Sequence, residues 1–180
     1  MLKIFRKKLI SKKSKKGISF IAKLFKKGTI SYPIDYEVCQ PTEEELKDTL
    51  NCWFGNSKWS ENGDRFIQFG MDGTGSMYCL WFYPNLSAEP PVVLFGSEGE
   101  RFLVASNVDD FIRQLSSGKL FCGGHWLEPD DEEKSELDWS YLKTKAVEYL
   151  GEWADSPEAI RDKAKLSHPN FSAWVEGKSS

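Results

Sequence analysis

Four short apolar runs separated by tight turns, between residues 66 and 105, constrain the fold of this chain more than any other feature. The runs cover residues 66–69, 77–83, 92–95 and 102–105. Asp72-Gly73 favours a positive-φ turn between the first two, and the polar residues 97–100 connect the last two. Parallel strands need a crossover of a dozen or more residues, and these connections are too short for one. The stretch therefore predicts an antiparallel meander.

Helices are predicted on both sides of this meander. After the fourth run, apolar residues recur at helical spacing: Val108, Phe111, Ile112 and Leu115. Such a stripe can lie on a sheet, and Ser106 or Asn107 can cap its start. Before the meander, Thr42 and Glu45 have the spacing of a capping box. The expected fold class is α+β, with a central antiparallel meander sheet flanked by helices.

The turn after the first run is rich in glycine and raises the question of a phosphate site. Its members are Gly70, Asp72, Gly73 and Gly75. A phosphate-binding loop needs a following helix start and a Lys-Ser/Thr pair, and here a strand follows instead. We therefore interpret these residues as a structural turn.

The order of motifs in this region resembles the SUKH superfamily, also called the SMI1/KNR4 domain. Residues 69–76 read FGMDGTGS, residues 91–93 read PVV, residues 96–100 read GSEGE, and Val104-Ala105 leads to residues 110–112, DFI. The resemblance covers residues 66–115 well and the flanks loosely. It implies an α+β domain and, for bacterial members, an immunity protein that neutralises a toxin of a polymorphic toxin system. Eukaryotic members are regulators, so the resemblance leaves more than one function open.

Charge divides the chain into two parts. Of the 24 Lys and Arg residues, 11 lie in residues 1–34, which hold no Asp or Glu, so the remaining 13 accompany all 27 acids. Residues 35–180 therefore carry a net charge of −14. A surface this acidic repels nucleic acid and attracts basic partners, although solubility alone would also account for it. We interpret residues 1–34 as a basic leader and residues 35–180 as a single domain.

The leader is interpreted either as a flexible tail or as an amphipathic helix. Ile18, Ile21, Leu24 and Phe25 fall at helical spacing among its lysines. It lacks the unbroken apolar core of a secretory signal and the ~20 apolar residues of a membrane span. A basic amphipathic segment can lie on an anionic membrane through residues 1–27, bind an acidic partner, or fold back on the acidic domain.

The acidic run EPDDEEKSE, residues 128–136, is the best local candidate for docking a basic protein. We expect it to be an exposed loop leading to a helix capped by Ser135, and a solvated charge run is the simpler alternative. Trp126 is added as a possible interface anchor, since interfaces favour tryptophan, although it can equally be core. The candidate partner-binding residues are Glu98, Glu100, Trp126, Glu128, Asp130, Asp131, Glu132 and Glu133.

The cysteines give little sign of chemistry. Cys39, Cys52, Cys79 and Cys122 are scattered without a CxxC pair, which is typical of reduced, mostly buried thiols in a cytoplasmic protein. Cys122 and His125 form a lone Cys-x-x-His, and a structural zinc site needs about four ligands. A Cys–His nucleophile would also need a third, orienting group. We therefore expect no catalytic residue, no metal and no cofactor.

Two functions remain open at the level of the sequence. The first is an immunity protein that neutralises a cognate toxin, possibly a nuclease, by direct stoichiometric binding. The second is a non-catalytic regulatory or scaffold module attached peripherally to a membrane through the basic leader.

Overall fold

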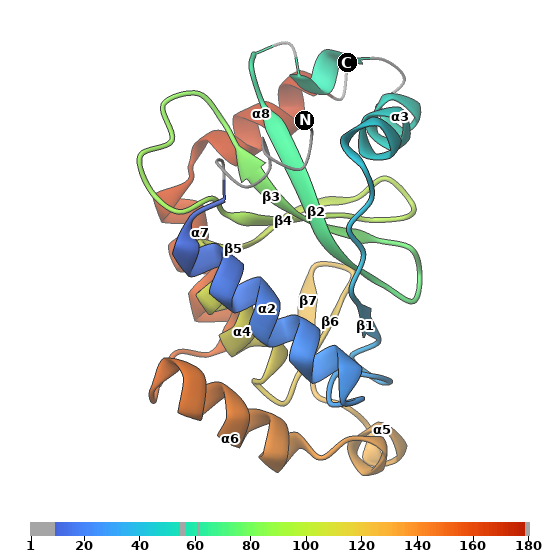
Figure 1. The fold of residues 1–180 in the computed structure, drawn as a ribbon, viewed down its shortest axis with the longest axis vertical. Coiled ribbons are helices and arrows are strands. Elements are labelled where there is room, and N and C mark those ends of the chain that lie inside the picture. The colour runs from blue at the N-terminus through green and yellow to red at the C-terminus, as the bar shows by residue number, and fades with distance from the viewer. Residues whose placement is uncertain (1–9, 55–56, 61, 179–180) are drawn as a thin grey trace.

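The computed structural model of the chain describes residues 10–54, 57–60 and 62–178 (Figure 1). Five strands form one sheet in the order β1-β2-β3-β4-β5, and each neighbouring pair is antiparallel. The strands are β1 (Tyr36–Glu37), β2 (Arg65–Asp72), β3 (Met77–Phe82), β4 (Val92–Phe95) and β5 (Arg101–Ala105). The predicted meander is confirmed, and so is the α+β class.

Seven α-helices and a short hairpin complete the described residues. The helices are α2 (Lys12–Lys26), α3 (Glu43–Trp53), α4 (Val108–Leu115), α5 (Asp131–Glu136), α6 (Trp139–Leu150), α7 (Pro157–Ser167) and α8 (Asn170–Lys178), with a 3-10 turn at Ser57–Ser60. The hairpin pairs β6 (Leu120–Cys122) with β7 (His125–Leu127). The single helix expected to start at Ser135 is wrong. Helix α5 begins earlier, at Asp131, and ends at Glu136, and α6 begins as a separate helix at Trp139. Asp130 and Asp138 cap α5 and α6 because both carboxylates accept a backbone N–H of the following turn.

The sheet is buried on both faces, which explains why β3 is apolar at nearly every position. Tyr78 and Leu80 belong to a main core with α2, α4 and α6. Cys79 and Trp81 point to a second core, where α3 and α8 cover the opposite face. Successive side chains of a strand alternate between faces. A strand covered on both sides therefore reads as a continuous apolar run.

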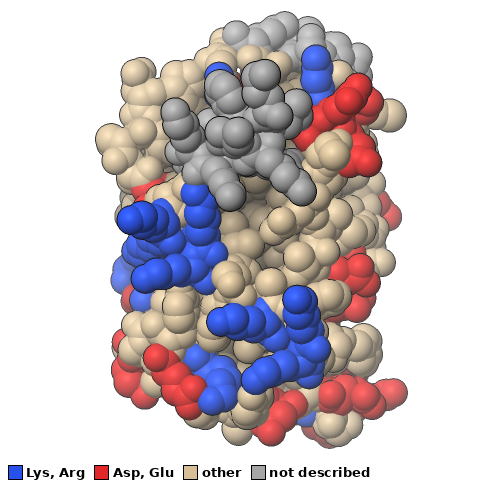
Figure 2. Space-filling view, in the orientation of Figure 1, with Lys and Arg blue, Asp and Glu red and all other residues tan. Residues whose placement is uncertain are grey.

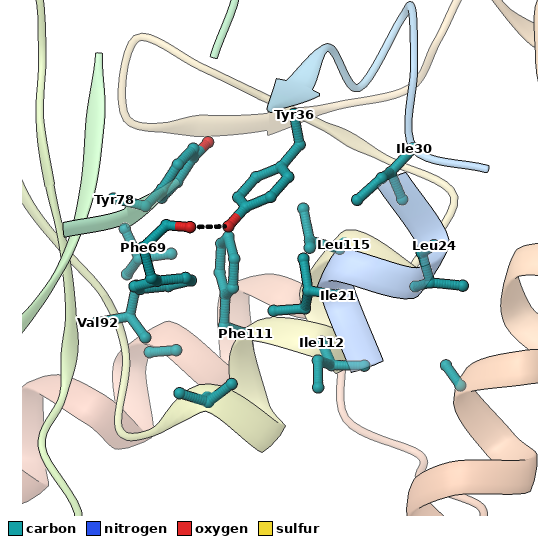
Figure 3. Packing of buried hydrophobic residues seen from close by; sticks show 14 of the residues in the cluster. Ile21, Leu24, Ile30, Tyr36, Phe69, Tyr78, Val92, Phe111, Ile112 and Leu115 are labelled. Atoms are coloured by element: carbon teal, nitrogen blue, oxygen red, sulfur yellow. Dashed lines mark hydrogen bonds between the residues drawn. The ribbon is translucent and has the colours of Figure 1, made fainter. Parts of the chain in front are cut away.

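The helix of the basic leader is part of the main core. Ile21 and Leu24 are 1% and 4% exposed and belong to the same core cluster as Ile112 of α4, and Figure 3 shows Ile21 beside Ile112. Gly17 allows this close approach, since a Cβ at its position would lie 2.6 Å from Val108 Cγ1. The lysine-rich composition of residues 1–34 predicts a leader separate from the domain. The structure gives it an amphipathic helix whose apolar face lies against the domain.

Polar contacts also hold α2 against acidic residues of the domain. The hydroxyls of Ser11 and Ser14 donate to the Glu89 carboxylate at 2.7 and 2.6 Å. Lys13 lies 3.2 Å from Asp109 at the start of α4. Of the arrangements that the sequence left open, the described part of the leader adopts the one folded back on the acidic domain.

The glycine-rich turn is built from side-chain contacts within the turn and against β1. Asp72 Oδ1 accepts hydrogen bonds from the backbone N–H groups of Thr74 and Ser76, both at 3.0 Å. Gly75 has a φ of +88°, which favours glycine. Gly70 and Gly73 leave room for Tyr36 and Asp35, whose side chains a Cβ would strike. All the oxygen and N–H groups named here serve the turn itself.

Tyr36 links this turn to the main core. Its hydroxyl donates to the Phe69 carbonyl at 3.0 Å, as Figure 3 shows. Burial raises the pKa of the Tyr36 phenol well above its ordinary value, so the phenol stays a donor at any physiological pH. Phe69 and Phe111 meet edge to face beside it, with ring centroids 5.7 Å apart.

Candidate protein-binding surface

The acidic run folds as a short exposed helix. Asp130 Oδ1 accepts from the Glu133 N–H, and Glu133 Oε2 accepts from the Asp130 N–H, both at 2.9 Å. This capping box, with further acids in the first turn, satisfies the helix start and suits its positive dipole. No residue of α5 is buried. The predicted acids are therefore presented to solvent on a defined element.

Two exposed non-polar side chains lie beside these acids. Tyr32 is 53% exposed and Leu127, next to Glu128, is 51% exposed. Partial desolvation raises the pKa of Tyr32, and nearby negative charges raise it further; the contributing acids are Glu133, Glu132, Asp130 and Glu136. Asp130 and these three acids of α5 therefore lie within electrostatic range of Tyr32. We call the set formed by Tyr32, Leu127, Glu128, Asp130–Glu133 and Glu136 the α5 surface.

Few cations neutralise the α5 surface. Lys119 lies 3.7 Å from Glu128 but is closer, at 3.0 Å, to Glu158 of α7. Lys134 lies 3.9 Å from Asp131, whose side chain is fully exposed. Exposed pairs of this kind contribute little and are screened by salt. The six acids of the α5 surface outnumber these two lysines, so the surface itself carries a net negative charge.

Trp126 does not contribute to this surface. It is 9% exposed and packs within the main core against Phe121, with ring centroids 4.9 Å apart. Acting as an anchor would require it to leave the core. Tyr32 is an exposed aromatic residue within electrostatic range of the acids of α5. The sequence gives no local signal for this neighbourhood, because those acids are about a hundred positions away in the chain.

Glu98 and Glu100 belong to a different part of the molecule, the turn between β4 and β5. Both are exposed. Glu100 Oε2 accepts from the Glu98 N–H at 3.2 Å, so one of the two carboxylates closes the turn. The Ser97 N–H donates to Ser76 Oγ at 3.4 Å, which sets this turn beside the glycine-rich one. The structure brings six of the eight predicted residues near one end of the β6–β7 hairpin and leaves these two apart.

Cys122 and His125 face each other across the β6–β7 hairpin. They are register partners on the two strands, and both are exposed. Cys52 is exposed as well and Cys79 alone of the four cysteines is buried, so the expectation of mostly buried thiols is wrong. Over the described ranges, no group of three or more His, Cys, Asp or Glu residues is arranged to hold a metal ion. In the same ranges, no helix combines the length and apolar character of a membrane span.

The exposed side of α2 is basic. Figure 2 shows lysines gathered along this helix, whereas acids lie over α3 and at the end of the molecule that holds α5. The exposed lysines of α2 and the residue after it are Lys12, Lys13, Lys16, Lys23, Lys26 and Lys27. Phe25 is 38% exposed among them. The folded protein thus presents basic residues along α2, and in this view they border the acids at the end of the molecule that holds α5.

The chain is an α+β protein whose meander sheet is covered on both faces and whose helix α5 is acidic and exposed to solvent. Comparison with protein-family models, with curated proteins and with solved structures finds no match.

Proposed function

We propose that the chain is an immunity protein, which acts in the cytoplasm by binding a cognate toxin domain with one-to-one stoichiometry and covering its active site. The observation that carries the proposal is the α5 surface, where six acids accompany the exposed Tyr32 and Leu127, and four of these acids lie within electrostatic range of Tyr32. The resemblance to the SUKH superfamily supports it, and the α+β meander fold agrees with what that resemblance implies.

The chemistry of this surface fits a toxin that acts on nucleic acid. A nuclease cleft is basic because it holds phosphates. Acids opposite such a cleft speed association through long-range steering, whereas the tyrosine and leucine offer area that can be desolvated at the centre of a contact. Tyrosine is among the residues that carry most binding energy at interfaces. Blocking by occupancy requires no catalytic group on this chain.

The test is co-expression with the toxin encoded beside this chain, followed by affinity measurement on the purified pair. The informative variant is the double charge reversal Asp131→Lys with Glu132→Lys, in the first turn of α5. The matched control is Glu43→Lys with Glu44→Lys, which makes the same charge change in the first turn of α3, another helix closed by a capping box. We expect the α5 variant to weaken binding by about tenfold or more, mainly through slower association, and the α3 variant to stay within about twofold.

A third variant, Tyr32→Ala, addresses the non-polar part of the surface and should speed dissociation. Survival of toxin-expressing cells provides the biological readout. Cell death with no complex on a sizing column would reject the proposal for that toxin. Equal loss of affinity in the α3 and α5 variants would instead move the binding site away from the α5 surface.

A membrane-attached regulatory or scaffold module is the second candidate, and the basic face of α2 with Phe25 favours it. Insertion of the apolar face of α2 into lipid would require Ile21 and Leu24 to leave the core, so attachment in the folded state would rest on the lysines and Phe25. Such electrostatic attachment is sensitive to salt and to anionic lipid. Flotation of the whole chain with phosphatidylserine vesicles, compared with a Lys23→Gln, Lys26→Gln, Lys27→Gln variant, tests it. Failure of the unaltered chain to float removes this candidate.

A further inference from the structure

A cavity of about 540 Å³ lies between β5, the β6–β7 turn and α7. Its size lies in the range of small-molecule sites. Its charged and titratable lining residues are all basic or histidine: Arg101, His125, Arg161, Lys165 and His168. No Asp or Glu is among the described residues that line it. In a chain with 27 acids, such a lining is a local reversal of charge.

Helical periodicity brings the α7 members together. Arg161 and Lys165 are four residues apart and therefore lie on the same face of α7. His168 follows at the end of the helix, at the next position of that face, and it is buried. On the opposite side of the cavity, Arg101 begins β5. Its guanidinium lies over the Phe54 ring, 4.2 Å from the centroid, so α7 supplies the cations nearest to the cavity and Arg101 adds a basic residue to its edge.

The wall of the cavity is held in place by the arginine itself. Arg161 Nη1 donates to the Gly124 carbonyl in the β6–β7 turn. Gly124 has a φ of +82° and lies so close to Phe102 that a Cβ would come within 2.7 Å of the ring. A turn with this backbone and packing needs glycine at the position. Contacts of Gly124 with Arg161 and with Phe102 therefore join the hairpin turn to α7 and to β5 at this cavity.

One donor of the Arg161 guanidinium has no partner in the described part of the fold. Its Nε is buried and has no hydrogen-bond partner among the described residues. Buried donors of a charged group without a partner are costly and uncommon in native proteins. The guanidinium presents a planar set of donors that suits the paired oxygens of a carboxylate or phosphate.

Apolar groups complete the lining. Phe102, Leu103, Pro169 and Phe171 accompany the cations. A free inorganic ion would leave these surfaces uncovered, whereas a ligand with an aromatic or aliphatic body would cover them. We propose that this cavity binds a small organic oxyanion, a carboxylate or a phosphate monoester on an apolar body, with Arg161 and Lys165 as its principal cationic contacts.

The experiment is an NMR titration of the whole chain at constant ionic strength, with three probes: phenyl phosphate, benzoate and inorganic phosphate. We expect saturable shifts of the Arg101, Gly123 and Gly124 amides, with the two aromatic probes binding more tightly than inorganic phosphate. Whichever aromatic probe binds better identifies the anionic group. Arg161→Gln and Lys165→Gln should each lower the affinity for that probe by about tenfold.

The matched control is Lys163→Gln, on the same helix but outside the cavity, where Lys163 pairs with Asp155 at 2.6 Å. It removes the same charge and should change the affinity by less than about twofold. Should Arg161→Gln fail to fold, Lys165→Gln decides, since the Lys165 side chain is 57% exposed. Lys165 Nζ pairs with Asp162 at 3.3 Å, so both lysine variants remove one partner of a surface ion pair and differ in their place relative to the cavity. Non-saturable shifts, shifts confined to the α2 lysines, or an equal loss in the Lys163 variant would overturn the proposal.

Discussion

Replacing Ile21 by alanine tests whether the basic leader helix is an integral part of the fold. Ile21 is 1% exposed and packs in the main core against α4. The substitution removes three carbon groups from this contact. It leaves the lysine face of α2 untouched, so charge does not confound the outcome.

The expected loss of stability follows from the burial. At ~0.8 kcal/mol for each buried carbon group, the transfer contribution is ~2.4 kcal/mol. The cavity left behind adds to this, whereas alanine regains about 0.4 kcal/mol through its higher helix propensity. We therefore expect the free energy of unfolding to fall by about 3 kcal/mol. With a urea m-value of about 2 kcal/mol/M, the unfolding midpoint should fall by about 1.5 M.

Urea unfolding followed by tryptophan fluorescence is a suitable assay because the described part of α2 contains no tryptophan. Trp81 and Trp126 are buried in the two cores and report the body of the protein. The midpoint shifts only if α2 unfolds together with that body. Lys23→Ala, on the exposed side of the same helix, should change the unfolding free energy by less than about 0.5 kcal/mol. Coincident unfolding curves for the Ile21 variant and the unaltered chain would refute the reasoning.

Three further predictions concern single positions. Gly70→Ala should lower the free energy of unfolding by more than about 2 kcal/mol in the same urea assay, because the added Cβ would strike the Tyr36 ring. Gly177→Ala should not lower it, because no side chain in the described part of the chain, its two neighbours aside, lies within 4 Å of the added Cβ. His168 is buried, and desolvation lowers its pKa below 6.5, so the unfolded chain binds more protons and stability should fall as pH drops from 7.5 through 6.5. His168→Asn should flatten that slope in pH-dependent urea midpoints. Cys52 and Cys122 are exposed, whereas Cys79 is buried and its burial raises the pKa of its thiol. A thiol reagent should therefore label Cys52 and Cys122 at once and Cys79 only on unfolding. Prompt labelling of Cys79 would contradict its buried position.

Local signals in the sequence anticipated the parts of the fold that depend on neighbours in the chain. The meander followed from short turns between apolar runs, and α4 followed from its apolar stripe and its Asn107 cap, which accepts from the Asp110 N–H at 3.0 Å. The Thr42–Glu45 capping box is present as predicted. The helix after the acidic run was misplaced, because Asp130 and Asp138 compete with Ser135 as caps and periodicity alone does not rank them.

The candidate surfaces depended on contacts that periodicity does not specify. The apolar stripe of the leader was visible, yet nothing local indicated that α4 would cover it. Trp126 and Tyr32 have similar aromatic character, and tertiary packing placed the first in the core and the second beside α5. The cationic cavity joins β5 with α7, elements separated by more than fifty residues.

The amino-acid order alone determined which segments form strands and helices and which side of each is apolar, because turns, caps and periodicity act over a few residues. Only the tertiary structure decided which apolar sides meet, which aromatic side chains stay in solvent and where charges gather. Those outcomes depend on burial and on electrostatics between residues distant in the chain, and the free energy of both is set by the complete packing.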